Sequence, residues 1–227
     1  MMNFKNVFYV RSFAWRSTRW AGLRKHVFVL LLLGLCSVRA FAADTLLILG
    51  DSLSAGYQMP AANAWPTLLN TQWQTQKKGI AVVNASISGD TTAQGLARIP
   101  ALLKQHQPRW VLIELGGNDG LRGFPAANIE QDLMKIITLV KQANAQPLLM
   151  QIRLPTNYGR RYTESFSNIY PKLAEQFALP LLPFFMEQVY LKPEWMMEDG
   201  IHPTRDAQPF IAEWMAKQLE PLVNHES

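Results

Sequence analysis

Three residues near opposite ends of the chain are of the types that catalyse acyl transfer. Ser52 lies in the segment Gly-Asp-Ser-Leu-Ser at residues 50–54, and Asp199 stands three residues before His202. A serine hydroxyl is a weak nucleophile until a base accepts its proton, and histidine can be that base near neutral pH. A carboxylate can hold the imidazole in the required tautomer and stabilise its cation. These residue types are therefore compatible with a serine hydrolase.

Two further segments supply donors that can meet the oxyanion of a tetrahedral intermediate. Gly89 lies in Ser-Ile-Ser-Gly-Asp at residues 86–90, and Asn118 lies in Gly-Gly-Asn-Asp at residues 116–119. Because glycine has no Cβ, a ligand can approach the Gly89 N–H closely. Each such donor contributes about 2.7–4 kcal/mol to transition-state stabilisation. Each segment alone is typical of an ordinary turn, so the indication of catalysis comes from their occurring together.

The elements that must position these residues follow from the alternation of short apolar runs with longer helical patterns. Apolar runs without polar alternation suit strands that are buried on both faces. We expect strands at residues 45–49, 80–83, 110–115 and 147–152, a weaker strand at 181–185, and helices at 65–76, 91–105, 126–143, 165–177 and 206–219. We expect Asn128 or an adjacent residue to cap the third helix. Strands that alternate with helices predict a single α/β/α domain with a parallel sheet.

The candidate residues gather at one edge of this predicted sheet. Residues 50–54, 86–90 and 116–119 follow the first three strands, and residues 199–203 precede the last helix. In an open parallel sheet, ligands bind beyond the carboxyl ends of the strands. We expect the Leu53 side chain, next to Ser52, to help line an acyl site, and Asp51 to anchor the turn through backbone N–H groups.

The four segments resemble, in chain order, the motif blocks of the SGNH, or GDSL, hydrolase family. The resemblance covers residues 44–220 and shows no departure at any block position. It implies a flavodoxin-like, three-layer α/β/α sandwich around a five-stranded parallel sheet. It also implies that Ser52 is the nucleophile, His202 the base and Asp199 its partner, with Ser52, Gly89 and Asn118 forming the oxyanion hole.

The resemblance further implies a periplasmic serine hydrolase that needs no metal or organic cofactor. Its expected substrates are small acyl esters: fatty acyl thioesters such as acyl-CoA, lysophospholipids and aryl esters, with protease activity as a side reaction. An α/β-hydrolase of the lipase type is disfavoured, because Ser54 stands where the Gly-x-Ser-x-Gly elbow requires glycine.

Two alternatives remain open from the residues alone. One is a metal-dependent phosphoesterase in which Asp51, Asn118, Asp199 and His202 surround a divalent ion, because carboxylate, amide and imidazole groups can bind such ions. The other is a flavodoxin-like periplasmic binding module without catalytic activity. The binding module would leave the combination of serine, aspartate and histidine without a purpose.

Residues 1–42 have the pattern of a cleaved signal peptide. They contain seven basic residues and no acidic one, an apolar run at 27–35, and Ala-Phe-Ala at 40–42. We predict cleavage after Ala42, which leaves one hydrolase domain at 43–227. Nine apolar residues span about 14 Å as a helix, against about 30 Å of hydrocarbon, so a stable membrane span is disfavoured. A lipoprotein is also disfavoured, because Leu35 precedes Cys36.

Charge and cysteine content narrow the function of the remaining chain. The net charge of +5 comes from the N-terminal segment, because residues 43–227 carry 15 basic and 17 acidic residues, a net charge of −2. We therefore expect no nucleic-acid partner. Cysteine is absent from residues 43–227, which excludes disulfides, thiolate nucleophiles and cysteine-bound zinc there. We expect a monomer.

The irregular segment 153–164 allows two interpretations. It is either a solvated connection or a mobile wall over the acyl site, since long irregular loops near sheet ends often act as lids. Arg160 and Arg161, within it, are candidates to bind a phosphate of coenzyme A or of a lysophospholipid.

Overall fold

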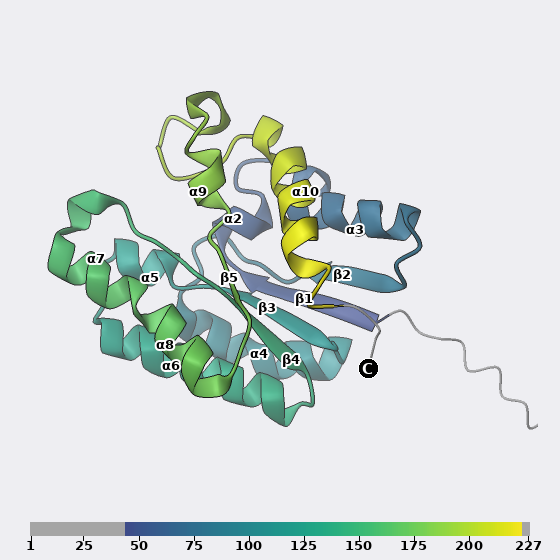
Figure 1. Ribbon diagram of the computed structural model, residues 1–227, viewed down its shortest axis with the longest axis horizontal. Helices are drawn as coiled ribbons and strands as arrows, with labels where there is room; N and C mark the ends of the chain where they lie inside the picture. Colours follow the sequence, from purple (N-terminus) through teal and green to yellow (C-terminus); the bar gives the residue numbers. More distant parts are fainter. Residues whose placement is uncertain (1–43, 224–227) are drawn as a thin grey trace, which may run out of the picture. The chain divides into compact units, whose positions relative to one another are not determined.

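The computed structural model describes residues 44–223, which surround a sheet of five parallel strands in the order β2-β1-β3-β4-β5 (Figure 1). The strands are β1 (Asp44–Gly50), β2 (Ile80–Asn84), β3 (Trp110–Glu114), β4 (Gln146–Met150) and β5 (Leu181–Leu182). Leu46, Leu47, Ile48 and Leu49 of β1 are completely buried, as expected for a strand covered on both faces. The predicted five-stranded parallel sheet is confirmed.

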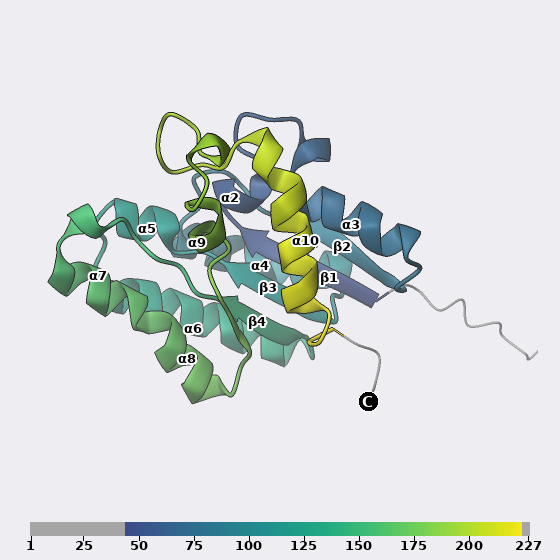
Figure 2. The same ribbon diagram turned by 45° about the horizontal axis from the view of Figure 1, so that its top comes forward.

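Helices cover both faces of this sheet and complete three layers. On one face lie α3 (Trp65–Thr75) and α10 (Gln208–Leu219); on the other lie α4 (Thr92–His106), α6 (Ala126–Gln142) and α8 (Ile169–Phe177) (Figures 1 and 2). The apolar stripe of α6 is buried, as its spacing of three and four residues predicts. The α/β/α sandwich is thus also confirmed.

The remaining helical elements are short and lie in the connections. They are α2 (Ser52–Ala55), α5 (Gly117–Leu121), α7 (Arg160–Ser167) and α9 (Met186–Val189), with 3₁₀ turns at Ala61–Asn63, Thr156–Tyr158, Pro193–Trp195 and Arg205–Ala207. Two of them, α2 and α5, begin directly beyond the carboxyl ends of β1 and β3. They therefore hold residues at the sheet edge where ligands bind.

The strand order reverses at the centre of this edge. The chain runs from β1 to β2 on one side of β1 and then returns to β3 on its other side. The connections that leave β1 and β3 therefore run in opposite directions, although these two strands are neighbours. At such a switch point the connections leave a crevice beyond the strand ends. The turns after β1 and β3 carry Ser52 and Asn118, so the topology places both at this crevice.

Two predicted elements differ from the structure. The helix expected at 165–177 is divided into α7 and α8, because Pro171 has no N–H to donate to the carbonyl of Ser167. That carbonyl instead accepts a hydrogen bond of 3.1 Å from Gln151 Nε2. The strand expected at 181–185 ends at Leu182, because Pro183 follows and the chain turns into α9.

Two smaller expectations are also wrong. Asn128 lies inside α6, whose N-cap is Pro125, and no side chain caps that end. The segment 153–164 is not irregular throughout, because it contains the turn Thr156–Tyr158 and the start of α7.

The predicted signal peptide, residues 1–42, lies outside the described part of the chain, so its cleavage stays a prediction. Among residues 44–223, no helix is both long enough and apolar enough to cross a membrane.

Candidate active site

Ser52, His202 and Asp199 lie in one hydrogen-bonded line. Ser52 is the first residue of α2, directly beyond β1. Its Oγ is 2.8 Å from His202 Nε2, and His202 Nδ1 is 2.7 Å from Asp199 Oδ2. Both distances are those of good hydrogen bonds. The fold therefore brings together a hydroxyl, an imidazole and a carboxylate whose first and last members are far apart in sequence.

The segment before α10 holds the imidazole in place through Asp199. Asp199 Oδ1 accepts hydrogen bonds from the backbone N–H groups of Ile201 at 2.9 Å and His202 at 3.0 Å. The N–H of Met197 donates to the His202 carbonyl at 2.9 Å and closes the loop. Desolvation opposes ionisation of Asp199, but the hydrogen bonds from His202 and Ile201 outweigh it and lower the pKa of this carboxyl. Asp199 is therefore ionised at neutral pH.

Tyr57 packs against the imidazole, a contact that the sequence did not reveal. The rings of Tyr57 and His202 are stacked, with centroids 4.0 Å apart and planes inclined by 22°. Tyr57 follows α2 and belongs to none of the four motif segments, so no sequence signal pointed to it. The hydrogen bonds of His202 act in the plane of its ring, and the stack with Tyr57 limits movement of the ring out of that plane.

Asp51 shapes the turn that presents Ser52. Its Oδ1 accepts the Leu53 N–H at 3.1 Å and caps α2, which confirms the expected anchoring role. Its Oδ2 accepts from Asn118 Nδ2 at 3.1 Å and links this turn to α5. Burial raises the pKa of Asp51 to about 7, although the hydrogen bonds from Leu53 and Asn118 act in the opposite direction.

Glu114 is a second buried carboxyl beneath the same turn, and sequence reasoning missed it. Its Oε2 accepts a hydrogen bond from Ser54 Oγ at 2.7 Å and a longer one of 3.4 Å from the Asp51 N–H. Burial, followed by the nearby charge of Asp51, holds the pKa of Glu114 well above its usual range. The available signal was a lone carboxyl at the end of the apolar run of β3.

Asp119 connects the turn after β3 to the start of α4. Its carboxylate accepts the Thr92 N–H at 2.9 Å and the Thr92 hydroxyl at 2.7 Å. These bonds tie α5 to the first turn of α4. Burial raises the pKa of Asp119, while the two bonds from Thr92 partly offset this effect.

Gly89 occupies a tight turn whose geometry explains the glycine. The Asp90 N–H donates to the Ile87 carbonyl at 3.1 Å, and Gly89, the third residue of the turn, has φ +85°. Positive φ at this position favours glycine, because a Cβ would strain the backbone. A Cβ on Gly89 would meet nothing within 4 Å, so its surroundings are open. Among the described residues, no group accepts the backbone N–H of Gly89 or Ser52.

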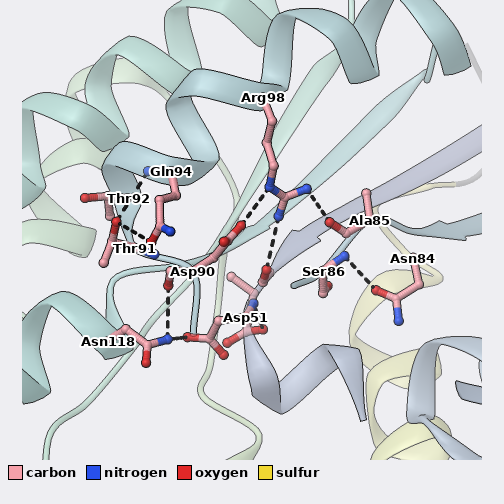
Figure 3. Close-up of polar contacts among 12 residues, drawn as sticks. Asp51, Asn84, Ala85, Ser86, Asp90, Thr91, Thr92, Gln94, Arg98 and Asn118 are labelled. Carbon is pink, nitrogen blue, oxygen red and sulfur yellow. Dashed lines mark hydrogen bonds and ion pairs between the residues drawn. The ribbon is translucent and has the colours of Figure 1, made fainter. Parts of the chain in front are cut away.

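Asn118 lies between the turns that carry Ser52 and Gly89 (Figure 3). Its Nδ2 donates to Asp51 Oδ2 at 3.1 Å and to the Asp90 carbonyl at 3.0 Å. A side-chain amide has two N–H donors, so both have acceptors in this structure. Asp51 and Asn118 line the cavity described next, whereas Asp90 does not.

An apolar cavity of about 180 Å³ opens beside Ser52 and His202. Leu53 is among its lining residues, so it lies where the sequence prediction of an acyl site requires it. A second hollow of about 320 Å³ shares much of the same wall. The residues common to both are Arg153, Leu154, Pro155, Phe184, Tyr190 and Gly200. Together the two hollows form one groove that leads away from Ser52, which we call the acyl groove.

The segment 153–164 contributes only its beginning to this groove. Arg153, Leu154 and Pro155 line the wall, but Arg160 and Arg161 do not. Arg160 is 89% exposed and pairs with Glu164 one helical turn away. Nothing in this geometry supports the idea that the two arginines bind a substrate phosphate.

The residues considered for a metal centre are engaged with one another instead. In the described part of the chain, no group of three or more His, Cys, Asp and Glu side chains is placed to hold a metal ion. Asp199 bonds to His202, and Asp51 bonds to Leu53 and Asn118. This arrangement favours nucleophilic catalysis over the metal-dependent phosphoesterase.

A three-layer parallel fold with serine, histidine and aspartate at its switch point defines a hydrolase of the serine type. The chain belongs to the GDSL-like lipase/acylhydrolase family, whose model matches residues 48–208, and it is an esterase. Over 227 residues, all of both chains, it is 68% identical to the thioesterase 1/protease 1/lysophospholipase L1 of Escherichia coli strain K12. It is 56% identical to the arylesterase of Vibrio mimicus, over 81% of this chain and 92% of that one.

The fold also resembles that of a solved esterase. The psychrotrophic esterase EstA from Pseudoalteromonas, in a structure inhibited by monoethylphosphonate, superimposes with a TM-score of 0.78. The two sequences are 39% identical, and the match covers 79% of this chain and 98% of the esterase.

Proposed function

We propose that this esterase hydrolyses carboxylic esters and thioesters of fatty acids through an acyl-enzyme formed on Ser52. The observation that carries the proposal is the line from Ser52 Oγ to His202 Nε2 and on to Asp199, with bonds of 2.8 and 2.7 Å. It supplies a nucleophile, a base and a group that orients the base, which are the three members of a catalytic triad.

In the first half of the reaction, Ser52 Oγ attacks the acyl carbonyl and His202 Nε2 accepts its proton. Asp199, whose low pKa keeps it ionised, stabilises the imidazolium cation. The tetrahedral intermediate then collapses, and His202 gives the proton to the departing alcohol or thiol. In the second half, His202 activates water, which hydrolyses the acyl-enzyme and regenerates Ser52. The substrate and one water molecule are the only groups from outside the chain that this scheme uses.

The oxyanion would be met by the backbone N–H groups of Ser52 and Gly89 and by the Asn118 amide. The first two have no acceptor among the described residues, which supports this role. For Asn118, the oxyanion would share the hydrogen that points toward Asp51, because both of these residues line the cavity. Such three-centre hydrogen bonds are common in proteins.

The substrates that we propose are fatty acyl thioesters, lysophospholipids and aryl esters, with peptide cleavage as a side reaction. The activities for which the two relatives are named and the apolar lining of the acyl groove support this range. An apolar groove favours the hydrocarbon part of an ester, whereas the leaving group stays nearer the surface.

We further propose that the enzyme is exported to the periplasm and acts as a monomer after cleavage following Ala42. The basic, apolar and small-residue regions of residues 1–42 support export. The test is the N-terminal sequence of the protein recovered from the periplasmic fraction, together with its mass in solution. A mature protein that begins elsewhere than Ala43, or a stable dimer, would correct this proposal.

The function is tested by replacing the nucleophile. We expect Ser52→Ala to lower kcat on p-nitrophenyl esters and palmitoyl-CoA by at least about 10⁴-fold and to abolish labelling by a fluorophosphonate probe. Ser88→Ala, at an exposed serine near Gly89, is the matched control and should keep both properties. Labelling and hydrolysis that survive in Ser52→Ala would show that another residue carries the reaction.

A further inference from the structure

Arg98 contacts two of the strand-end turns at the catalytic edge, those that follow β1 and β2 (Figure 3). It projects from α4 and uses three nitrogens. Its Nε donates to Asp90 Oδ2 at 2.7 Å, its Nη2 donates to the Gly50 carbonyl at 3.4 Å, and its Nη1 donates to the Ala85 carbonyl. A planar guanidinium can hold three acceptors in fixed directions at once, which an ammonium group cannot do.

Each acceptor belongs to a segment that carries a proposed oxyanion donor. Gly50 ends β1 and lies two residues before Ser52. Ala85 follows β2 and begins the turn that contains Gly89. Asp90 directly follows Gly89, and its carbonyl accepts the Asn118 amide at 3.0 Å.

The burial of Arg98 strengthens its hydrogen bonds. The side chains of Arg98 and Asp90 are only 20% and 7% exposed, so water competes little for their groups. The surface-exposed Arg122 also contacts this turn, through a bond of 3.2 Å to the Gly89 carbonyl. Arg122 touches only the Gly89 turn, whereas Arg98 joins the turns of Ser52 and Gly89 from the protein interior, and the Asp90 carbonyl extends this link to Asn118.

From these contacts we propose that Arg98 is a positioning residue of the reaction: its ion pair with Asp90 and its bonds to Gly50 and Ala85 set the relative positions of the three oxyanion donors. This inference rests on the proposed function. Preorganised donors lower the barrier only when they lie at hydrogen-bond distance from the oxyanion, so a small displacement costs rate and not substrate binding. Arg98 does not touch the substrate and acts through Gly89 and Asn118.

The positive charge of Arg98 also favours the reaction. Asp90 places a carboxylate beside a site where negative charge develops during the reaction. The guanidinium neutralises that carboxylate at 2.7 Å. Asp90 then offers the site only its backbone carbonyl, which orients Asn118.

The test uses Arg98→Lys, which keeps the charge and removes the planar fork. We expect kcat on a p-nitrophenyl ester to fall between about tenfold and a hundredfold, with KM changed less than threefold, because loss of a whole oxyanion donor costs about 10²–10³ in kcat. Rates are referred to active enzyme, counted by complete titration with a fluorophosphonate. Arg109→Lys is the matched control, because Arg109 pairs with Asp44 at 2.6 Å at the opposite end of the sheet. It should stay within twofold of the wild type.

A double variant separates positioning from mere structural support. In an Asn118→Ala background, Arg98→Lys should lower kcat by a smaller factor than it does in the wild-type background, because one of the three donors that it positions is already absent. A structural role would instead lower the melting temperature and leave the two effects on kcat multiplicative. If Arg98→Lys does not fold, Asp90→Asn breaks the same ion pair from its other side and carries the same expectations.

The proposal fails if kcat of folded Arg98→Lys, or of Asp90→Asn in its place, stays within twofold of the wild type, or if the effects multiply with Asn118→Ala. Failure of the proposed function would be seen separately, as activity that survives Ser52→Ala.

Discussion

The catalytic edge has two regions that differ in how they are held. The first comprises the strand-end turns, residues 50–55, 85–91 and 115–121, which follow β1, β2 and β3 directly. Asp51 and Asp119 in these turns, and Glu114 at the end of β3, are buried and hydrogen-bonded to neighbouring turns. The second comprises the outer segments, residues 151–159 and 183–204, which line the acyl groove and carry exposed groups such as Tyr190 and Leu191.

The difference appears most clearly in the acids. Burial raises the pKa values of Asp51, Glu114 and Asp119, so the neutral form becomes accessible where the carboxyl serves structure. Asp199, in an outer segment, is 38% exposed and its pKa is lowered. In the proposed mechanism, the acid that must carry charge therefore lies where water and hydrogen bonds stabilise that charge. That mechanism separates rigid positioning of the oxyanion donors from charge-dependent chemistry and substrate binding.

The largest effect is expected from neutralising the exposed acid. Asp199→Asn should lower kcat by about 10⁴-fold, because an amide at this place favours the wrong tautomer of His202. Steady-state kinetics on a p-nitrophenyl ester would measure it. The same substitution type one residue earlier, Glu198→Gln, should stay within twofold. A loss below tenfold for Asp199→Asn would mean that the outer segment does not supply the orienting charge.

The buried acids predict a pH-dependent stability. Because the pKa of Asp51 is about 7 in the folded protein and 3.8 for an ordinary aspartate, the folded state binds more protons between these values. The stability that this group contributes is complete below pH 4 and is lost as the pH rises to about 7, by an amount on the order of a few kcal/mol. We expect Asp51→Asn to flatten this decline.

Urea unfolding between pH 4 and pH 8 would measure the effect. Asp206→Asn, at an exposed aspartate, is the control and should follow the wild-type curve. An Asp51→Asn curve parallel to that of the wild type would contradict the assignment of the decline to Asp51.

The packing against His202, in the outer segment 183–204, can be weakened through Tyr57. Tyr57→Ala should lower kcat/KM about fivefold, because ring stacking contributes roughly 0.5–1.5 kcal/mol. Tyr57→Phe keeps the ring and should behave like the wild type. Equal losses in both variants would point to the phenol hydroxyl and away from the stack on His202.

An effect limited to KM for long-chain substrates is expected in the acyl groove. Tyr190→Ala should raise KM for long-chain esters about fivefold, because it removes roughly 1 kcal/mol of apolar contact, and should leave acetate esters unchanged. Leu191→Ala is the control, because Leu191 is more exposed and does not line the groove. Kinetics across a series of p-nitrophenyl esters would measure both. A uniform effect across chain lengths would indicate that Tyr190 does not contact the acyl chain.

Much of the fold could be predicted because its signals are local. A run such as Leu46–Leu49 has no polar residue to face water, and the spacing of Ile129, Leu133 and Ile136 defines a helical face. Two of the errors fall at prolines, because Pro171 and Pro183 interrupt elements that the apolar spacing alone would continue. The break between α7 and α8 is then stabilised by a distant residue, Gln151, which donates a hydrogen bond to the Ser167 carbonyl.

The candidate site shows the same division. Ser52, Gly89, Asn118, Asp199 and His202 were nominated from residue type, motif and chain order, and their catalytic roles stay predictions that the variants above test. Glu114, Tyr57 and Arg98 were not nominated. Each acts through a partner from another segment, and no motif or period in the sequence encodes that pairing.

The amino-acid sequence by itself determined the alternation of strands and helices, the acidic balance of residues 43–227 and the order of the four polar segments, since these depend on neighbouring residues. Only the tertiary structure decided that Ser52 and His202, 150 residues apart, approach to 2.8 Å. It also decided that Asp51 and Glu114 are buried and that one guanidinium joins two turns. These features depend on how the strands pair across the sheet and how the connections pack above it, and such long-range packing is a property of the whole folded chain.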